Sequence, residues 1–198
     1  VVQKLSVFGQ PKHSYLRQWT FGNRLPYNKD SIAETIADCL KCLYEQVEAV
    51  SHLHTYPQRE QYLHSLLNQS PGLDLQLMEA LKALMMLRAI ALHDLYTAQR
   101  NSQDGASVFA WLLYSRKTSE TPEQLFRNHI DKIGDTGTAG QVELYLLGHT
   151  LGVKIEVIRP ALLGQDNFIC HYPDEGADAF PKVYLVAEDD RHYNVVVP

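Results

Sequence analysis

The residues best suited to chemistry stand near the end of the sequence, where His192 and Asn194 flank one tyrosine. Apolar runs at 182–186 and 195–197 enclose this segment, which predicts two short strands joined by a polar turn. Side chains two apart on a strand share a face, so the imidazole and the amide would lie side by side. The amide oxygen would accept the Nδ1–H of the ring and leave Nε2 facing a nucleophile. The pattern predicts the base and orienting partner of a Cys–His–Asn site.

A structural role for the same residues is the alternative. In a chain with nine histidines a His-x-Asn triplet can arise by chance, and His192 would then be an ordinary histidine on an edge strand. The context strengthens the catalytic interpretation without deciding it, because a turn rich in acids precedes the triplet and a run of valines follows it. Ionisable groups with perturbed pKa values are often found at functional sites, so we treat this cluster as a candidate site.

The cysteines offer a second possible chemistry. Cys39 and Cys42 would lie one turn apart on a helix, with His52 and His54 downstream, which superficially resembles a zinc site. No second ligand pair follows at zinc-finger spacing, and the cysteines fall inside an amphipathic helix instead of at its N-terminus, where a thiolate would be stabilised. We interpret them as helix packing and expect no metal and no cofactor.

Composition limits the class of protein. The chain has 198 residues, of which 45% are hydrophobic, and this suits one domain over residues 1–198 with a sizeable core. A net charge of −5 with scattered basic residues argues against nucleic acid and suits a basic protein surface as partner. No apolar run has the length of a membrane span, and three cysteines make no disulfide framework. We expect a soluble, cytoplasmic protein.

Helical signals come first and strand signals last. A capping box at Ser31–Glu34 predicts one helix start, and Thr121, Pro122 and Gln124 predict another. We expect helices over about 32–47, 57–67, 73–96, 108–114, 121–133 and 141–151, and strands over 153–158, 168–172, 183–187 and the terminal segment. The order predicts the α+β class, a helical N-terminal part followed by a small, mostly antiparallel sheet.

Several segments together resemble a known family. They are Ala187 to Asn194, Arg17 to Gly22, Leu112 to Arg116 with Thr118 and Ser119, Arg127 to His129, Gly134 to Gly137, and Gln141 to Glu143. In their order along the chain they are similar to the otulin family of the ovarian-tumour (OTU) cysteine proteases, a group close to peptidase family C65. The resemblance implies a papain-like OTU fold and a deubiquitinase that hydrolyses linear polyubiquitin in immune and NF-κB signalling.

The resemblance also implies roles for individual residues. His192 would be the general base and Asn194 its orienting partner, while Asp189 would hold the unbound imidazole in a non-productive rotamer; an ordinary turn aspartate is the alternative. Leu112 and Asn167 would contact ubiquitin, although Leu112 sits in a segment apolar enough to be core, and the family position of Asn167 is usually acidic. The implied partners are linear polyubiquitin and the linear ubiquitin ligase complex, and the protein would be a monomer.

The nucleophile of that family is absent from the sequence. It is a cysteine that follows Gly-Asp-Asn-Tyr, N-terminal to the segment matched at Arg17, and no such motif occurs. We expect a segment before Val1 to carry it, so that residues 1–198 alone are inactive. The alternative is a pseudoenzyme that serves as a ubiquitin-binding or membrane-associated scaffold. A helical interaction module unrelated to ubiquitin is a third hypothesis.

Overall fold

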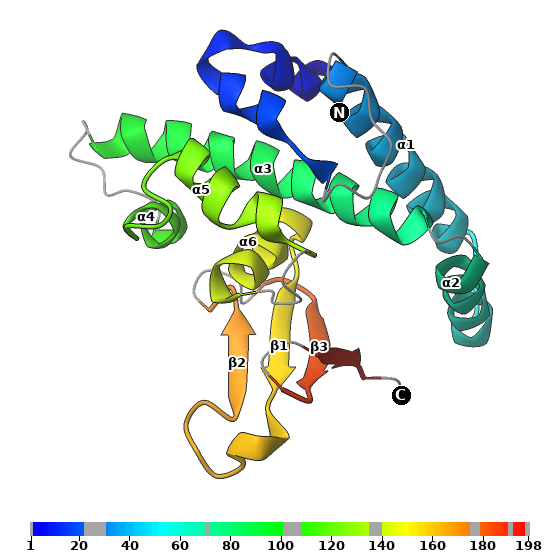
Figure 1. Cartoon of the computed structure of the whole chain (residues 1–198). Helices are drawn as coiled ribbons and strands as arrows, with labels where there is room; N and C mark the ends of the chain where they lie inside the picture. Colours follow the sequence, from blue (N-terminus) through cyan, green and yellow to red (C-terminus); the bar gives the residue numbers. More distant parts are fainter. Residues whose placement is uncertain are drawn as a thin grey trace. The chain divides into compact units, whose positions relative to one another are not determined.

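The computed structural model describes residues 2–21, 31–69, 72–100, 108–134, 140–174, 179–189 and 192–196. The chain divides into two compact units, Val1–Leu84 and Met85–Pro198, with the boundary inside helix α3 (Leu73–Arg100) (Figure 1). Gly137 and Val197, which belong to a matched segment and to the expected terminal strand, lie outside the described residues.

The first unit is helical. Two 3₁₀ segments, η1 (Val2–Gly9) and η2 (Pro11–Gln18), precede α1 (Ile32–Ser51), α2 (Tyr56–Gln69) and the start of α3. Its core holds a buried charged pair beneath an indole. Trp19 Nε1 donates to Glu79 Oε2 at 2.6 Å, and Lys82 Nζ lies 2.9 Å from Glu79 Oε1. These contacts tie η2 to the first turns of α3.

The start of α1 differs from the prediction. Ser31 is the N-cap, but its side chain makes no capping hydrogen bond. Its ψ of 42° departs from the extended conformation that aims an N-cap side chain at the first free N–H groups of a helix. The predicted capping box is therefore wrong, although a helix does begin at Ile32.

The second unit contains the rest of α3, then α4 (Val108–Tyr114), α5 (Pro122–Asn128), η5 (Ile130–Lys132) and α6 (Gln141–Leu151). The predicted cap of α5 is confirmed, because Thr121 Oγ1 accepts from the Gln124 N–H at 3.2 Å. The predicted single helix to about Ile133 is divided at His129, whose φ and ψ of −126° and −66° are not helical.

A four-stranded sheet closes the second unit. Its strands are β1 (Lys154–Ile158), β2 (Ile169–Tyr172), β3 (Lys182–Ala187) and β4 (Tyr193–Val195), in the order β2-β1-β3-β4, with the 3₁₀ turn η6 (Pro160–Leu162) after β1. β1 pairs with β3 in parallel, and the two outer pairings are antiparallel. The α+β class is confirmed, and the sheet is mixed. The structure does not test whether the architecture is that of a papain-like OTU protease.

Helix α6 packs against strands β1 and β2 and lies at their upper end in the view of Figure 1. Leu144 of α6 belongs to one buried cluster with Ile155, Val157, Tyr172 and Ala187, and Tyr193 packs against the same cluster. Residues whose side chains point to this core alternate along each strand with residues that point to the other face. Within the described ranges, no helix is long and apolar enough to cross a membrane.

Candidate active site

The turn between β3 and β4 carries the residues predicted to do chemistry. In the antiparallel pairing, Ala187 lies opposite Tyr193 and Val186 opposite Asn194. Ala187 and Tyr193 point into the core cluster. Their neighbours therefore project from the other face, and Asn194 is exposed. Tyr193 thus anchors the middle of the His-Tyr-Asn triplet, which leaves the residues on either side of it open to solvent.

His192 is held by Asp189. The backbone N–H of His192 donates to Asp189 Oδ1 at 2.8 Å, and Nδ1 of the ring lies 2.8 Å from Asp189 Oδ2. The turn is closed by the Glu188 N–H, which donates to the His192 carbonyl at 3.0 Å. An ionised carboxylate can only accept, so Nδ1 carries the proton and Nε2 of the neutral ring is the basic nitrogen. Nε2 has no hydrogen-bond partner in the part of the chain that the structure describes.

Asn194 has a different carboxylate as its partner. Its Nδ2 donates to Glu188 Oε1 at 2.7 Å. The expected hydrogen bond between His192 and Asn194 is thus not formed in this structure, and each side chain binds an acid of the turn. The physical reason is that an ionised oxygen is a stronger acceptor than an amide carbonyl, and the closed turn brings Asp189 within reach of the ring.

These contacts lie at the surface. The side chain of His192 is 69% exposed and that of Asp189 is 54% exposed. Exposed ion pairs are worth about 0–1 kcal/mol, because water screens them and both side chains lose rotamer freedom. The pairing therefore sets the direction of the ring in this structure but holds it only weakly.

The other predicted site residues lie on other elements. Leu112 is half-buried on α4, between the exposed Trp111 and the buried Leu113. Asn167 is exposed in the turn before β2, where its carbonyl accepts from Cys170 Sγ at 3.5 Å. Neither residue belongs to the β3–β4 turn itself.

The three cysteines form no disulfide bond. Cys39 and Cys42 belong to the first unit, whereas Cys170 and His192 belong to the second. Burial raises the pKa of Cys39 to about 12, and burial also raises the pKa of Cys42, so both thiols resist ionisation. Cys170 lies on β2, three strands from β4, which is about 14 Å at the usual strand spacing. It also pairs with Val157 and so faces the core side of the sheet.

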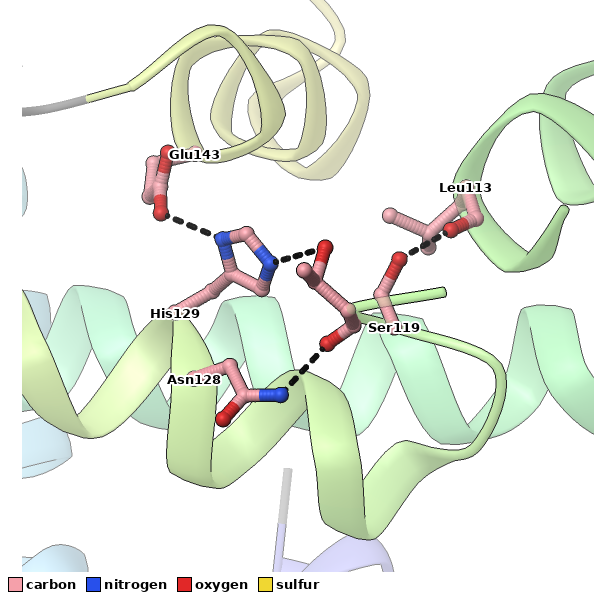
Figure 2. A network of polar contacts seen from close by, with 6 residues as sticks. Leu113, Ser119, Asn128, His129 and Glu143 are labelled. Atoms are coloured by element: carbon pink, nitrogen blue, oxygen red, sulfur yellow. Dashed lines mark hydrogen bonds and ion pairs between the residues drawn. The ribbon is translucent and has the colours of Figure 1, made fainter. Parts of the chain in front are cut away.

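A polar network in the second unit was not predicted. His129 Nδ1 lies 2.8 Å from Glu143 Oε1, and its Nε2 lies 3.1 Å from Thr118 Oγ1 (Figure 2). Asn128 Nδ2 donates to the Thr118 carbonyl at 2.8 Å, and Ser119 Oγ donates to the Leu113 carbonyl at 2.6 Å. The only signal in the sequence is that these residues come from the segments that carry the family resemblance.

This network has the residue types of a catalytic triad, but its geometry indicates a structural role, because it links neighbouring segments of the chain. Both ring nitrogens of His129 have partners, and the side chains of His129 and Glu143 are only 16% and 12% exposed. The ring joins the loop after α4 to the end of α5 and the start of α6. By contrast, the His192 ring is open at the nitrogen that a general base needs. Among the described residues, no cluster of histidine, cysteine and acidic side chains could hold a metal ion.

An exposed imidazole whose Nδ1 is held by a carboxylate and whose Nε2 has no described partner has the chemistry of a general base. Comparison with models of protein families finds a match over residues 2–197 to the family described as peptidase family C101. The match covers nearly the whole sequence, so the chain belongs to peptidase family C101.

This finding corrects the family assignment. The sequence resemblance indicates the otulin family of the OTU superfamily, placed close to peptidase family C65, whereas the family model that matches is that of C101. The prediction of a C65-like OTU family is therefore wrong. The broader prediction of a peptidase is supported, because the matching family is a peptidase family.

Proposed function

We propose that this protein is a cysteine-type peptidase in which His192 is the general base. One observation carries the proposal: Asp189 holds Nδ1 of His192 at 2.8 Å, while the His192 side chain is 69% exposed and Nε2 has no hydrogen-bond partner among the described residues. A ring protonated at Nδ1 is in the tautomer that can take a thiol proton at Nε2. Membership of a peptidase family supports the choice of reaction.

The proposed reaction has two stages. Nε2 of His192 takes the proton of a cysteine thiol, and the thiolate attacks the carbonyl carbon of the scissile peptide bond. The C–N bond breaks as Nε2–H returns the proton to the leaving amine, and a thioester remains. A water molecule, deprotonated by Nε2, then attacks the thioester and releases the carboxylic acid and the thiol. We expect the thiol to come from polypeptide outside these 198 residues, since Cys170 is about three strands away.

Asp189 and Asn194 have separate parts in this proposal. Asp189 holds the ring in the unbound protein, and Asn194 replaces it as the acceptor for Nδ1–H when substrate is bound. An amide acceptor orients the ring without adding a negative charge beside it. The 69% exposure of the His192 side chain leaves room for this movement.

For the substrate we propose linear polyubiquitin, whose linkage is an ordinary peptide bond, with the protein acting in the cytoplasm on linear-ubiquitin signalling. Two features support a protein substrate of this kind. The chain has a net charge of −5, which suits a basic protein surface. Helix α4 exposes about half of Val108 and half of Trp111 beside Leu112, an apolar surface suited to a partner's apolar patch.

The test is hydrolysis of diubiquitin by the full-length protein, before and after alkylation with iodoacetamide. Linear diubiquitin is compared with diubiquitin whose two units are joined through a lysine side chain. We expect cleavage of the linear form to be at least about 100-fold faster, and to be lost after alkylation. Cleavage that persists after alkylation would rule out the cysteine mechanism. Equal rates of cleavage for both kinds of linkage would rule out the preference for linear chains. Tight binding of linear diubiquitin without cleavage would replace the proposal with the scaffold hypothesis.

A further inference from the structure

The carboxamide of Asn194 is held in one of its two possible orientations. Its Nδ2 lies 2.7 Å from Glu188 Oε1, and an ionised carboxylate has no proton to donate. The group that faces Glu188 must therefore be the NH₂, and Oδ1 must be at the opposite end of the planar amide.

The sheet register explains why Glu188 is the partner. Asn194 lies opposite Val186, and Glu188 is two residues further along, on the same face and diagonally across. The N–H of Glu188 donates to the His192 carbonyl at 3.0 Å, which fixes its backbone at the end of the ladder. The two adjacent acids of the turn thus have different partners, Asp189 the imidazole and Glu188 the amide.

We propose that Glu188 is a positioning residue that presents Asn194 Oδ1 to the imidazole of His192, an inference that rests on the function proposed above. Nδ1 of His192 carries a proton when Asp189 releases the ring, so it needs an acceptor. A free carboxamide turns about its last bond and offers NH₂ as readily as oxygen, and two donors facing each other repel. By accepting from Nδ2, Glu188 disfavours the orientation of the Asn194 amide that would turn its NH₂ toward the imidazole of His192.

The first test is independent of catalysis and uses residues 1–198. In a ¹⁵N-correlated NMR spectrum, the two Asn194 Nδ2 protons should differ widely in chemical shift, because one of them faces a carboxylate. Glu188→Ala should move both to the values of a solvated asparagine, and Glu188→Gln, which keeps an acceptor oxygen, should restore most of the difference. Unchanged Asn194 resonances in Glu188→Ala would overturn the proposal.

The second test uses the full-length protein and linear diubiquitin. Glu188→Ala should lower kcat about three- to tenfold with KM within about twofold, and Glu188→Gln should recover it to within about twofold. In an Asn194→Ala background, Glu188→Ala should cost nothing further, because the residue acts through the amide. Glu123→Ala, which removes another exposed carboxylate, on α5, is the matched control and should leave kcat unchanged.

Losses that add in the double variant would overturn the positioning role. A wild-type protein that cleaves nothing would overturn the proposed function, and the amide resonances would still decide whether Glu188 orients Asn194. The two failures are therefore distinguishable.

Discussion

His192 Nδ1 and Asp189 Oδ2 lie 2.8 Å apart in the short turn between β3 and β4, and the backbone N–H of His192 binds the other oxygen of the same carboxylate. Both contacts hold the ring against the turn. The pairing leaves Asn194, the expected partner of the ring, bound to Glu188. Whether Asp189 restrains His192 or orients it for catalysis is a question that a single substitution answers.

If Asp189 restrains the ring, Asp189→Ala should raise kcat/KM for linear diubiquitin about two- to fivefold, because the ring no longer has to leave a carboxylate. Steady-state kinetics of the full-length protein measure this. Asp166→Ala, at an exposed position before β2, controls for the loss of one negative charge. A fall in kcat as large as that of Asn194→Ala would instead make Asp189 the orienting partner.

The buried pair of Glu79 and Lys82 should be essential to the first unit. Both side chains are 1% exposed, and Glu79 also accepts from Trp19 Nε1. Glu79→Ala leaves an ammonium and an indole N–H buried without their acceptor, and we expect a loss of about 3–5 kcal/mol in the free energy of unfolding. Urea unfolding of residues 1–198 measures it.

A double variant separates the buried charge from packing. Glu79→Gln with Lys82→Met keeps an acceptor for Trp19 and fills the volume of the lysine with an apolar chain. We expect it to be more stable than Glu79→Ala, since replacing a buried ion pair costs less than breaking it. Equal losses in the two proteins would show that the charges do not determine the stability.

His149 should make the protein sensitive to mild acid. Its ring lies against Phe109, with centroids 3.5 Å apart, and its Nδ1 accepts from Arg88 Nε at 3.0 Å. Burial, and secondarily the charge of Arg88, lower the pKa of His149 from 6.5 to about 4. Between these values the unfolded chain binds the proton and the folded chain does not. Stability is therefore complete above about pH 6.5 and falls as the pH drops towards about 4.

Because the ring is only partly buried, we expect this loss to be about 1–2 kcal/mol. Urea unfolding at about pH 7 and at about pH 4.5 measures it. His149→Gln, which keeps an acceptor for Arg88 but does not titrate in this range, should flatten the dependence. An unchanged pH profile in His149→Gln would assign the acid sensitivity to other groups.

Gly148 marks the closest approach of α6 to the sheet. A Cβ at this position would overlap the carbonyl oxygen of Tyr172 and would come within 2.9 Å of Pro173 Cδ and the Val153 carbonyl oxygen. Gly148→Ala should therefore destabilise the protein by about 2 kcal/mol or more, because two of these atoms are backbone and cannot turn aside. Gly9→Ala, where a Cβ meets nothing within 4 Å, is the control. A thermal midpoint unaffected by Gly148→Ala would contradict this packing.

Local signals in the sequence predicted several parts of the fold that depend on local contacts, although the capping box at Ser31 did not form. The start of α5 follows from a hydrogen bond between residues three apart, Thr121 and Gln124. The alternation that exposes Asn194 beside the core-facing Tyr193 follows from the period of a strand. The parallel pairing of β1 with β3 did not follow, because β2 lies between them in the chain and the choice of neighbour is a tertiary effect.

The partners of the candidate site were harder to predict. His192 binds an acid of the turn because that turn closes through the Glu188 N–H, a detail of backbone geometry that no spacing rule contains. His129 meets Glu143 across 14 positions and a loop, so neither helical nor strand periodicity could pair them. The residue types at the site were visible in the sequence, whereas their hydrogen-bond partners required the structure.

The most direct measurement is turnover of linear diubiquitin by the full-length protein carrying His192→Ala. Loss of the general base should lower kcat at least about 100-fold, and the thermal midpoint should change little, since the side chain is 69% exposed and contributes little packing. Turnover equal to that of the wild-type protein would contradict the account, because the open Nε2 of His192 would then have no part in the reaction.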